Sequence, residues 1–303
     1  SEKATYKFST SYLTNEGIVP NEEYGRKTFS LAGTLQANDK LKFTTTFNFI
    51  RSDYDRIQQG SNTSGLLLGL YRTPISFDNA NGFSAPDAVD SPSAYIFPNG
   101  NQRNYRGGGG YDNPYWIINN ALREETVNRV YGSFAVEYNV NKWLNAVLNV
   151  GADFTSDIRK QNFEKGSRTS SQGLSSLSQY TTYQSDAILN ISGGDAITDK
   201  LNLNYLVSAN AFSFQRTGLF TDGSNFAFQG FINLANASNI TGSESLLRNT
   251  QMGLVAQVEA DWDSTFYLTL AARQDYDSRL GVPGTEFKGS DYSFVYPAAS
   301  LSV

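Results

Sequence analysis

The sequence predicts an all-β chain, an antiparallel transmembrane β-barrel with about ten strands. About ten segments of roughly 10–13 residues put apolar or aromatic side chains at every second position, which places them on one face of a strand. Very short turns alternate along the chain with long loops rich in aromatic residues, Asn and Gly. Strands of about this length, with short turns at one end and long loops at the other, are typical of bacterial outer-membrane barrels.

The first three strands are predicted at about 4–14, at about 24–36 and in a segment that alternates over 41–49. The third has the clearest pattern, because Leu and Phe positions alternate there with Lys, Thr and Asn. A tight turn at 37–40 joins the second strand to the third, since its Asn and Asp side chains can bond to the nearby backbone.

A long segment without sustained periodicity follows at about 54–123, and we expect it to form a long extracellular loop. Strands resume at about 127–139 and 143–155, joined by another tight turn. A Ser/Gln-rich loop is predicted at about 156–179.

The remaining strands are predicted from the same alternation. In chain order they cover about 180–191, about 201–213, 252–262, a segment that starts at Phe266, and a last one from about Phe294 to the final residue. Residues 193–200 join the first two of these, and a long loop is expected at 214–248. The tight connections alternate with the long ones, so the short turns would face the periplasm and the long loops the exterior.

Composition fits a barrel and excludes several classes of protein. The 303 residues are 14% aromatic but only 17% charged, whereas soluble domains carry about 25% charged residues. The longest apolar run, at 65–71, is too short for a membrane helix, which needs about 20 residues. The net charge of −5 gives no basic surface for nucleic acid. The absence of Cys and His excludes disulfides, Ser-His-Asp catalysis and the usual zinc sites within this chain.

Three motifs that could carry chemistry have simpler interpretations. The four glycines at 107–110 are not followed by a helix or by Gly-Lys-Ser/Thr, so they do not predict a phosphate loop. Residues 78–82 loosely resemble a calcium loop, but Val89 stands where the bidentate Glu should be. Asp275 and Asp277 share a strand face, yet nothing distinguishes an acid from a nucleophile. The sequence therefore predicts no catalytic residue, no metal site and no cofactor.

The long loop carries the candidate binding residues. Aromatic rings offer stacking faces and Arg offers forked donors, which suit sugars, peptides or a protein partner. We expect ligand contacts from Arg72, Arg103, Tyr105, Arg106, Tyr111 and Trp116. The alternative is that these side chains pack the loop on itself.

The polar side chains that alternate with the apolar ones along each strand would line the lumen of the barrel. They include Arg129, Glu137, Asp153, Asp186 and Asn204. From alternation alone, a soluble β-sandwich or propeller remains the alternative, in which the apolar face covers a protein core.

Several segments together resemble the barrel region of SusC/RagA-type TonB-dependent outer-membrane transporters from Bacteroidetes-like bacteria. The resemblance rests on residues 55–65, 70–74 and 104–116, together with 15–20 and 296–303. It covers essentially the whole chain in order.

The resemblance implies an importer in the bacterial outer membrane, with a barrel of about 22 strands surrounded by lipid. It also implies a plug inside the barrel, uptake powered through TonB, and a SusD/RagB-like surface lipoprotein as a lid. The cargo would be an oligosaccharide or a peptide, and importer–lid pairs could associate as dimers. The six loop residues above would then contact ligand or lid, and the inward polar residues would contact the plug more than the cargo.

The chain departs from this pattern in extent, since we find no plug domain, no TonB-contacting segment and no remaining strands. An open sheet is not viable in lipid, because each unpaired backbone group there costs several kcal/mol. The interpretation we favour is about ten strands of a larger barrel, in a chain that is processed or is part of something longer. The alternative is a self-contained ten-stranded outer-membrane adhesin or surface protein. A soluble secreted β-protein is a third and weaker interpretation.

Overall fold

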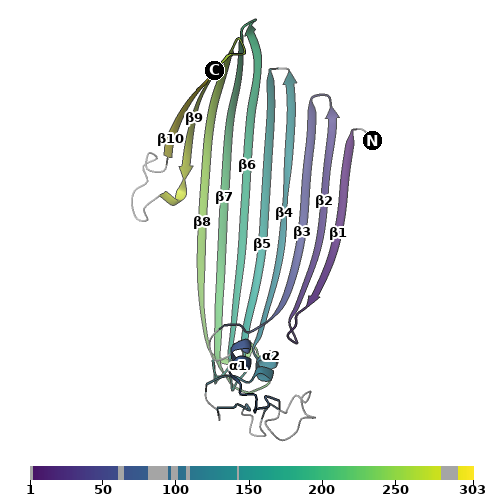
Figure 1. Cartoon of the computed structure of the whole chain (residues 1–303), viewed down its shortest axis with the longest axis vertical. Coiled ribbons are helices and arrows are strands. Elements are labelled where there is room, and N and C mark those ends of the chain that lie inside the picture. Colours follow the sequence, from purple (N-terminus) through teal and green to yellow (C-terminus); the bar gives the residue numbers. More distant parts are fainter. Residues whose placement is uncertain are drawn as a thin grey trace.

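The chain forms a single sheet of long antiparallel strands (Figure 1). The computed structural model describes residues 3–60, 65–80, 95–96, 102–106, 110–141, 143–280 and 293–303. Among these residues each strand pairs with its neighbours in chain order, from β1 to β10. The strands are β1 (Ala4–Glu16), β2 (Glu23–Asn38), β3 (Leu41–Ile57), β4 (Leu122–Asn141), β5 (Leu144–Phe163), β6 (Leu174–Thr198), β7 (Leu201–Phe226), β8 (Ala237–Trp262), β9 (Phe266–Asp277) and β10 (Ser293–Ser302). The predicted all-β antiparallel architecture is confirmed.

One face of the sheet is apolar across all ten strands, and we call it the outer face. Residues directly opposite each other in an antiparallel pair lie on the same face. In this register Val136 lies opposite Leu148, and Leu148 lies opposite Leu189. The series continues through β7 and β8, where Ala209 lies opposite Leu254. Leu254 is 52% exposed, so this apolar surface has no second layer of described residues to cover it.

The opposite face is polar, and we call it the lumen face. It carries the predicted inward residues, among them Arg129 and Asp153. The Arg129 side chain donates from Nε to Asp153 on the neighbouring strand at 3.0 Å. A sheet that is apolar on one face and polar on the other, with the apolar side exposed, fits a wall between lipid and a water-filled channel.

Strands β3 to β8 are longer than the sequence predicts, most of all β6, β7 and β8. The outer face stays apolar up to Phe49 on β3 and then continues with Arg51 and Asp53, which pair at 3.0 Å. Both faces are polar beyond this level, so the alternation disappears from the sequence although the backbone pairing continues. The loops predicted at 156–179 and 214–248 are therefore wrong, because β5 to β8 extend through most of them.

The true connections between these strands are shorter than predicted, although they are longer than the tight turns. They cover residues 164–173 between β5 and β6, and 227–236 between β7 and β8, where η2 (Leu234–Asn236) lies. The predicted connection at 193–200 is also too long, since β6 continues to Thr198 and the turn is formed by Asp199 and Lys200.

The tight turns lie at one end of the sheet and the long connections at the other, as predicted (Figure 1). Side chains close these turns, as the sequence indicates. Asn38 Oδ1 accepts from the backbone N–H groups of Lys40 and Leu41 at 2.9 and 3.0 Å. Thr198 Oγ1 accepts from Leu201 N at 3.1 Å in the β6–β7 turn. Such Asx and Ser/Thr turns fix the pairing of the strands that follow.

The long segment after β3 contains two helices that the sequence did not predict, α1 (Leu66–Arg72) and α2 (Pro114–Asn120). A 3₁₀ turn, η3 (Ser278–Leu280), follows β9. No helix among the described residues is long and apolar enough to cross a membrane. Within these residues β1 and β10 are the two edges of the sheet, so the sheet is open.

A glycine on β6 allows an aromatic contact near the short-turn end. Tyr205 lies opposite Gly193 and donates from its hydroxyl to the carbonyl oxygen of Trp143 at 3.1 Å. A Cβ on Gly193 would overlap this carbonyl oxygen, which belongs to the backbone and cannot move freely.

We expect Gly193→Val to lower the free energy of unfolding by about 1–3 kcal/mol, the range for overpacked sites. Urea unfolding of the full-length protein in lipid vesicles measures it. Gly25→Val on β2 is the control, because no atom lies within 4 Å of a Cβ added there. Equal unfolding midpoints for the two variants would contradict the proposed role of Gly193.

Candidate functional site

The connection between β3 and β4 has a small core of its own at the long-loop end of the sheet (Figure 1). Asn113 begins α2, because its Oδ1 accepts from Tyr115 N at 2.8 Å and Pro114 follows it at the first helical position. This arrangement is a standard helix start. The core that forms around α2 consists of Ile57, Leu66, Tyr95, Trp116, Ile117, Ala121 and Phe163.

A buried carboxylate joins this connection to the one between β5 and β6. Asp112 is 1% exposed, and its Oδ1 accepts from Gln102 Nε2 at 2.7 Å and from Arg168 N at 2.8 Å. Its Oδ2 accepts from Ser167 Oγ at 2.9 Å. Charge-assisted bonds of this kind are stronger than neutral ones, and they are stronger still away from water. Asp112 therefore fastens the β3–β4 connection to the β5–β6 connection.

Further polar contacts tie in the neighbouring connections. Glu164, 3% exposed, accepts from Gly230 N at 2.9 Å, and Lys165 Nζ donates to the carbonyl of Phe226 at 2.8 Å. On the other side Asn21 Nδ2 donates to the carbonyl of Ile118 at 2.9 Å. Four long connections are thus linked by hydrogen bonds, and we call this linked set the loop assembly.

Four of the predicted binding residues gather on the surface of the loop assembly. The Arg72 guanidinium donates to the Tyr111 hydroxyl and lies 5.1 Å from the centre of the Tyr111 ring. Arg106 lies over the rings of Tyr105 and Tyr111, at 5.6 and 5.2 Å. Two exposed guanidinium groups and two half-buried phenol rings therefore form one cluster, which keeps stacking and hydrogen-bonding groups together.

The other two predicted residues are described by different contacts. Trp116 is 1% exposed and lies in the core of the loop assembly, where it packs the loop on itself. The backbone of Arg103 bonds to the loop, since its carbonyl accepts from Asn113 Nδ2 at 3.0 Å. Contact of any of the six with ligand or lid stays a prediction.

An apolar groove of about 500 Å³ lies beside the cluster. It runs between the β1–β2 connection, at Ile18 and Val19, and the two helices, at Leu70 and Tyr115. Ile18 is fully exposed and Leu70 is 46% exposed, so apolar side chains are exposed at the long-loop end of the sheet. Exposed apolar surface rimmed by polar groups is a common feature of binding sites.

The lumen face carries a second polar group of residues on β3 to β7, which we call the arginine–tyrosine wall. Its members are Arg56, Glu125, Asp157, Arg159, Tyr180 and Arg216. The sequence did not predict these six as a group, because they are spread over 160 residues and only the strand register brings them together. The strand alternation, extended from the apolar positions of each strand, would have placed all six side chains on the lumen face.

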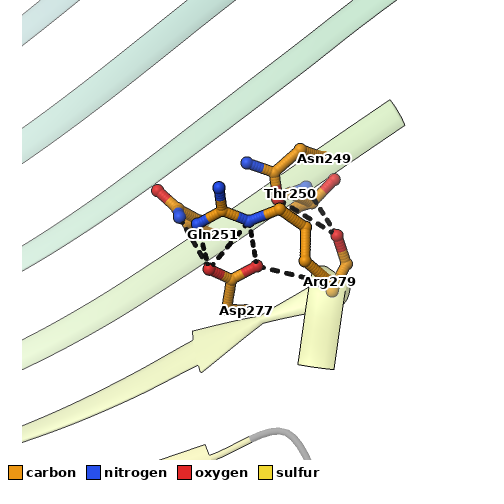
Figure 2. Close-up of polar contacts among 6 residues, drawn as sticks. Asn249, Thr250, Gln251, Asp277 and Arg279 are labelled. Atoms are coloured by element: carbon orange, nitrogen blue, oxygen red, sulfur yellow. Dashed lines mark hydrogen bonds and ion pairs between the residues drawn. The ribbon is translucent and has the colours of Figure 1, made fainter. Parts of the chain in front are cut away.

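A third polar group lies on β8 and β9 (Figure 2). Asp277 accepts from Arg279 Nη2 at 2.6 Å and from Gln251 Nε2 at 2.8 Å, and Thr250 N donates to Ser278 Oγ at 2.8 Å. These bonds hold η3 against β8 at the point where β9 ends.

The polar group on β8 and β9 does not have the form of an acid–nucleophile pair. The sequence prediction that Asp275 and Asp277 share a strand face is confirmed, but each is paired with an arginine. Asp275 accepts from Arg273 Nε at 2.8 Å. A cavity of about 360 Å³ next to them is lined by Asn210, Arg273 and Tyr296 among others. Such side chains suit hydrogen bonding to a polar solute.

The remaining motifs give no site in the described part of the chain. Residues 107–109 and 81–94, which hold most of the glycine run and of the loose calcium-loop pattern, lie outside the described residues. Within the described ranges no three Asp or Glu side chains are close enough to hold a metal ion.

Comparison with known proteins identifies the fold. No family model and no curated protein matches the chain. A solved structure of the RagAB peptide transporter matches 99% of the chain at 13% identity, with a TM-score of 0.72. The RagAB peptide importer in an "open-open" state matches at 14% identity, with a TM-score of 0.71. The ferric preacinetobactin receptor BauA from Acinetobacter baumannii matches 99% of the chain at 12% identity, with a TM-score of 0.52.

The matches also show what share of a barrel protein this chain represents. It spans 32% of the RagAB chain and 40% of the BauA chain. A likeness of this kind at such low identity shows the fold. The chain therefore has the fold of about a third of an outer-membrane β-barrel transporter, with ten consecutive strands of its wall.

Proposed function

We propose that residues 1–303 form part of the barrel wall of a SusC/RagA-type, TonB-dependent importer in the bacterial outer membrane. The observation that carries the proposal is the continuous outer apolar face on ten register-matched strands, backed by a polar lumen face. Only a barrel in lipid combines these two faces without an apolar core. The likeness to the RagAB transporter over 99% of the chain supports the same function.

The loop assembly fits the partner that this function needs. It lies at the long-loop end of the wall, which is the exterior in outer-membrane barrels. It presents the apolar groove and the arginine–tyrosine cluster at Arg72 and Arg106 as one linked body. We infer that a SusD/RagB-like lipoprotein docks here as a lid, and that oligosaccharide or peptide cargo is enclosed beneath it. TonB would act through a plug, and no bond chemistry is needed from this chain.

Cysteine labelling in whole cells tests location and orientation. The chain holds no Cys, so a single Cys introduced into it reports one site. We expect Ile75→Cys, in the fully exposed part of the β3–β4 connection, to react with a membrane-impermeant maleimide on intact cells. Asp39→Cys, in the short β2–β3 turn, should react only after the outer membrane is opened.

The protein without an added Cys is the background control. Labelling of both positions on intact cells would contradict the outer-membrane location and the orientation together.

Native mass spectrometry of the detergent-extracted complex tests the partner. A species about three times the 33.4 kDa of this chain, with a bound lipoprotein, supports the importer. A lone 33.4 kDa species that stays folded supports the ten-stranded surface protein instead.

A further inference from the structure

We propose that the arginine–tyrosine wall binds a carboxylate group of the cargo inside the barrel. The inference rests on the proposed import function and adds a chemical class of cargo to it. It assigns a binding role to Arg216 and Arg159 on the lumen face, beneath the loop assembly.

The strand register builds this wall. Glu125 lies opposite Arg159, and Asp157 lies opposite Tyr180, so the side chains of three neighbouring strands share the lumen face. Tyr180 in turn lies opposite Gly218 on β7. Since Gly218 has no side chain, its neighbours on the same face can approach the Tyr180 ring from both sides.

Both neighbours of Gly218 do so. The Arg216 guanidinium lies 4.3 Å from the centre of the Tyr180 ring, and the Phe220 ring meets it edge-on at 5.4 Å. Arg159 approaches the same ring from β5, at 5.4 Å. Two cations from different strands are therefore held beside one aromatic ring.

The charges are arranged so that the cations are the accessible groups. The side chains of Glu125 and Asp157 are only 11% and 13% exposed. The arginines that pair with them, Arg56 at 3.3 Å and Arg159 at 2.6 Å, are 39% and 43% exposed. A ligand in the channel would meet guanidinium groups and a phenol ring before it met a carboxylate.

Arg216 adds a charge that these carboxylates do not balance. Among the described residues it makes no ion pair, so the wall holds three guanidinium groups against two carboxylates. The contact with the Tyr180 ring positions the Arg216 guanidinium, and its N–H groups remain for a partner. A planar fork of this kind matches the two oxygens of a carboxylate.

The carboxylate could belong to an acidic peptide or to a uronic-acid oligosaccharide, so the experiment has two arms. Each arm compares a charged probe with its neutral counterpart, pentaglutamate with pentaglutamine and tetragalacturonate with galactotetraose. Dissociation constants are measured for the full-length protein in detergent, together with any lipoprotein that co-purifies. The variants are Arg216→Gln, Arg216→Lys and, as a control, Arg248→Gln.

Arg248 is a matched control because it lies on the adjacent strand but on the outer face, where its Nε donates to Gln215 at 3.0 Å. We expect one charged probe to bind more tightly than its neutral counterpart. Arg216→Gln should weaken binding of that probe about tenfold and reduce its dependence on salt, as expected for the loss of a charge-assisted fork. Arg216→Lys should retain part of the affinity, and Arg248→Gln should retain all of it.

Other outcomes overturn the inference. The wall is not a carboxylate site if neither charged probe is preferred, or if the preference survives in Arg216→Gln. An equal loss of affinity for charged and neutral probes would show that Arg216 only supports the fold or contacts another segment inside the barrel. Failure of the import function itself would appear in the cysteine labelling, which does not depend on the wall.

Discussion

Replacing Val150 with arginine should lower the free energy of unfolding by about 2–4 kcal/mol, the cost of a cation near the middle of the membrane. Val150 lies on β5 in the centre of the outer apolar face, opposite Phe134 on β4 and Ala187 on β6. It is 36% exposed in the sheet, so the arginine would project into lipid. Urea unfolding of the full-length protein in lipid vesicles measures the change.

The neighbouring residue gives a direct control. Asn149 precedes Val150 on the same strand and faces the lumen, so Asn149→Arg adds the same side chain at the same depth but in water. We expect this control to change the free energy of unfolding by less than about 1 kcal/mol. An equal loss for both variants would mean that Val150 does not face lipid, and it would favour a soluble sheet.

Replacing Asp112 with alanine should open the loop assembly. The change removes the acceptor of two buried donors, on Gln102 and Ser167, and of one partly buried donor, Arg168 N. Each buried unsatisfied group costs about 1–3 kcal/mol, so we expect a local loss of about 3 kcal/mol or more. The strands of the wall are paired independently of this contact and should stay folded. Hydrogen exchange, read separately for loop and strand peptides, measures the two effects.

A second carboxylate in the same connection serves as the control. Within the described part of the chain Asp78 makes one short-range bond, in which its Oδ1 accepts from Ala80 N at 2.8 Å. We expect Asp78→Ala to change loop exchange only slightly. Fast exchange in Asp112→Ala should come with weaker binding of the lid lipoprotein, because the connections that carry the groove and the cluster would no longer be held together. Unchanged exchange in Asp112→Ala would show that the buried core of the loop assembly is sufficient without this carboxylate.

The sequence predicts the membrane part of the wall well because lipid imposes a pattern on it. Positions such as Phe47 and Leu148 must be apolar while their neighbours face water, and this alternation marks every strand where it crosses the apolar band. In the part of the strands nearer the long connections both faces are polar, so the sequence there has no alternation of apolar and polar residues. Residues 174–182 are mostly Ser, Gln, Thr and Tyr on both faces, so they read as a loop although they are paired on both sides.

The candidate sites were predicted only in part, for a related reason. Asn113 followed by Pro114 is a helix-start signal, and it could have located α2, but seven residues give no clear periodicity. The clustering of Arg72, Arg106 and Tyr111 follows from their closeness in one connection. The meeting of Arg159 with Arg216 depends on the register of three strands, which the sequence does not state. Local patterns are readable, whereas contacts across the sheet depend on pairing.

The unequal lengths of neighbouring strands have a consequence for the outer rim of the wall. β8 begins at Ala237, but its pairing with β9 begins only at Gln251. From Ala237 to Asn249, within the described residues, the backbone of β8 bonds to β7 alone. At about 3.3 Å per residue this stretch is roughly 40 Å long. An unpaired edge of this kind is stable in water, and an extended chain can add a strand to it, so this flank of the wall has the backbone groups that strand addition requires.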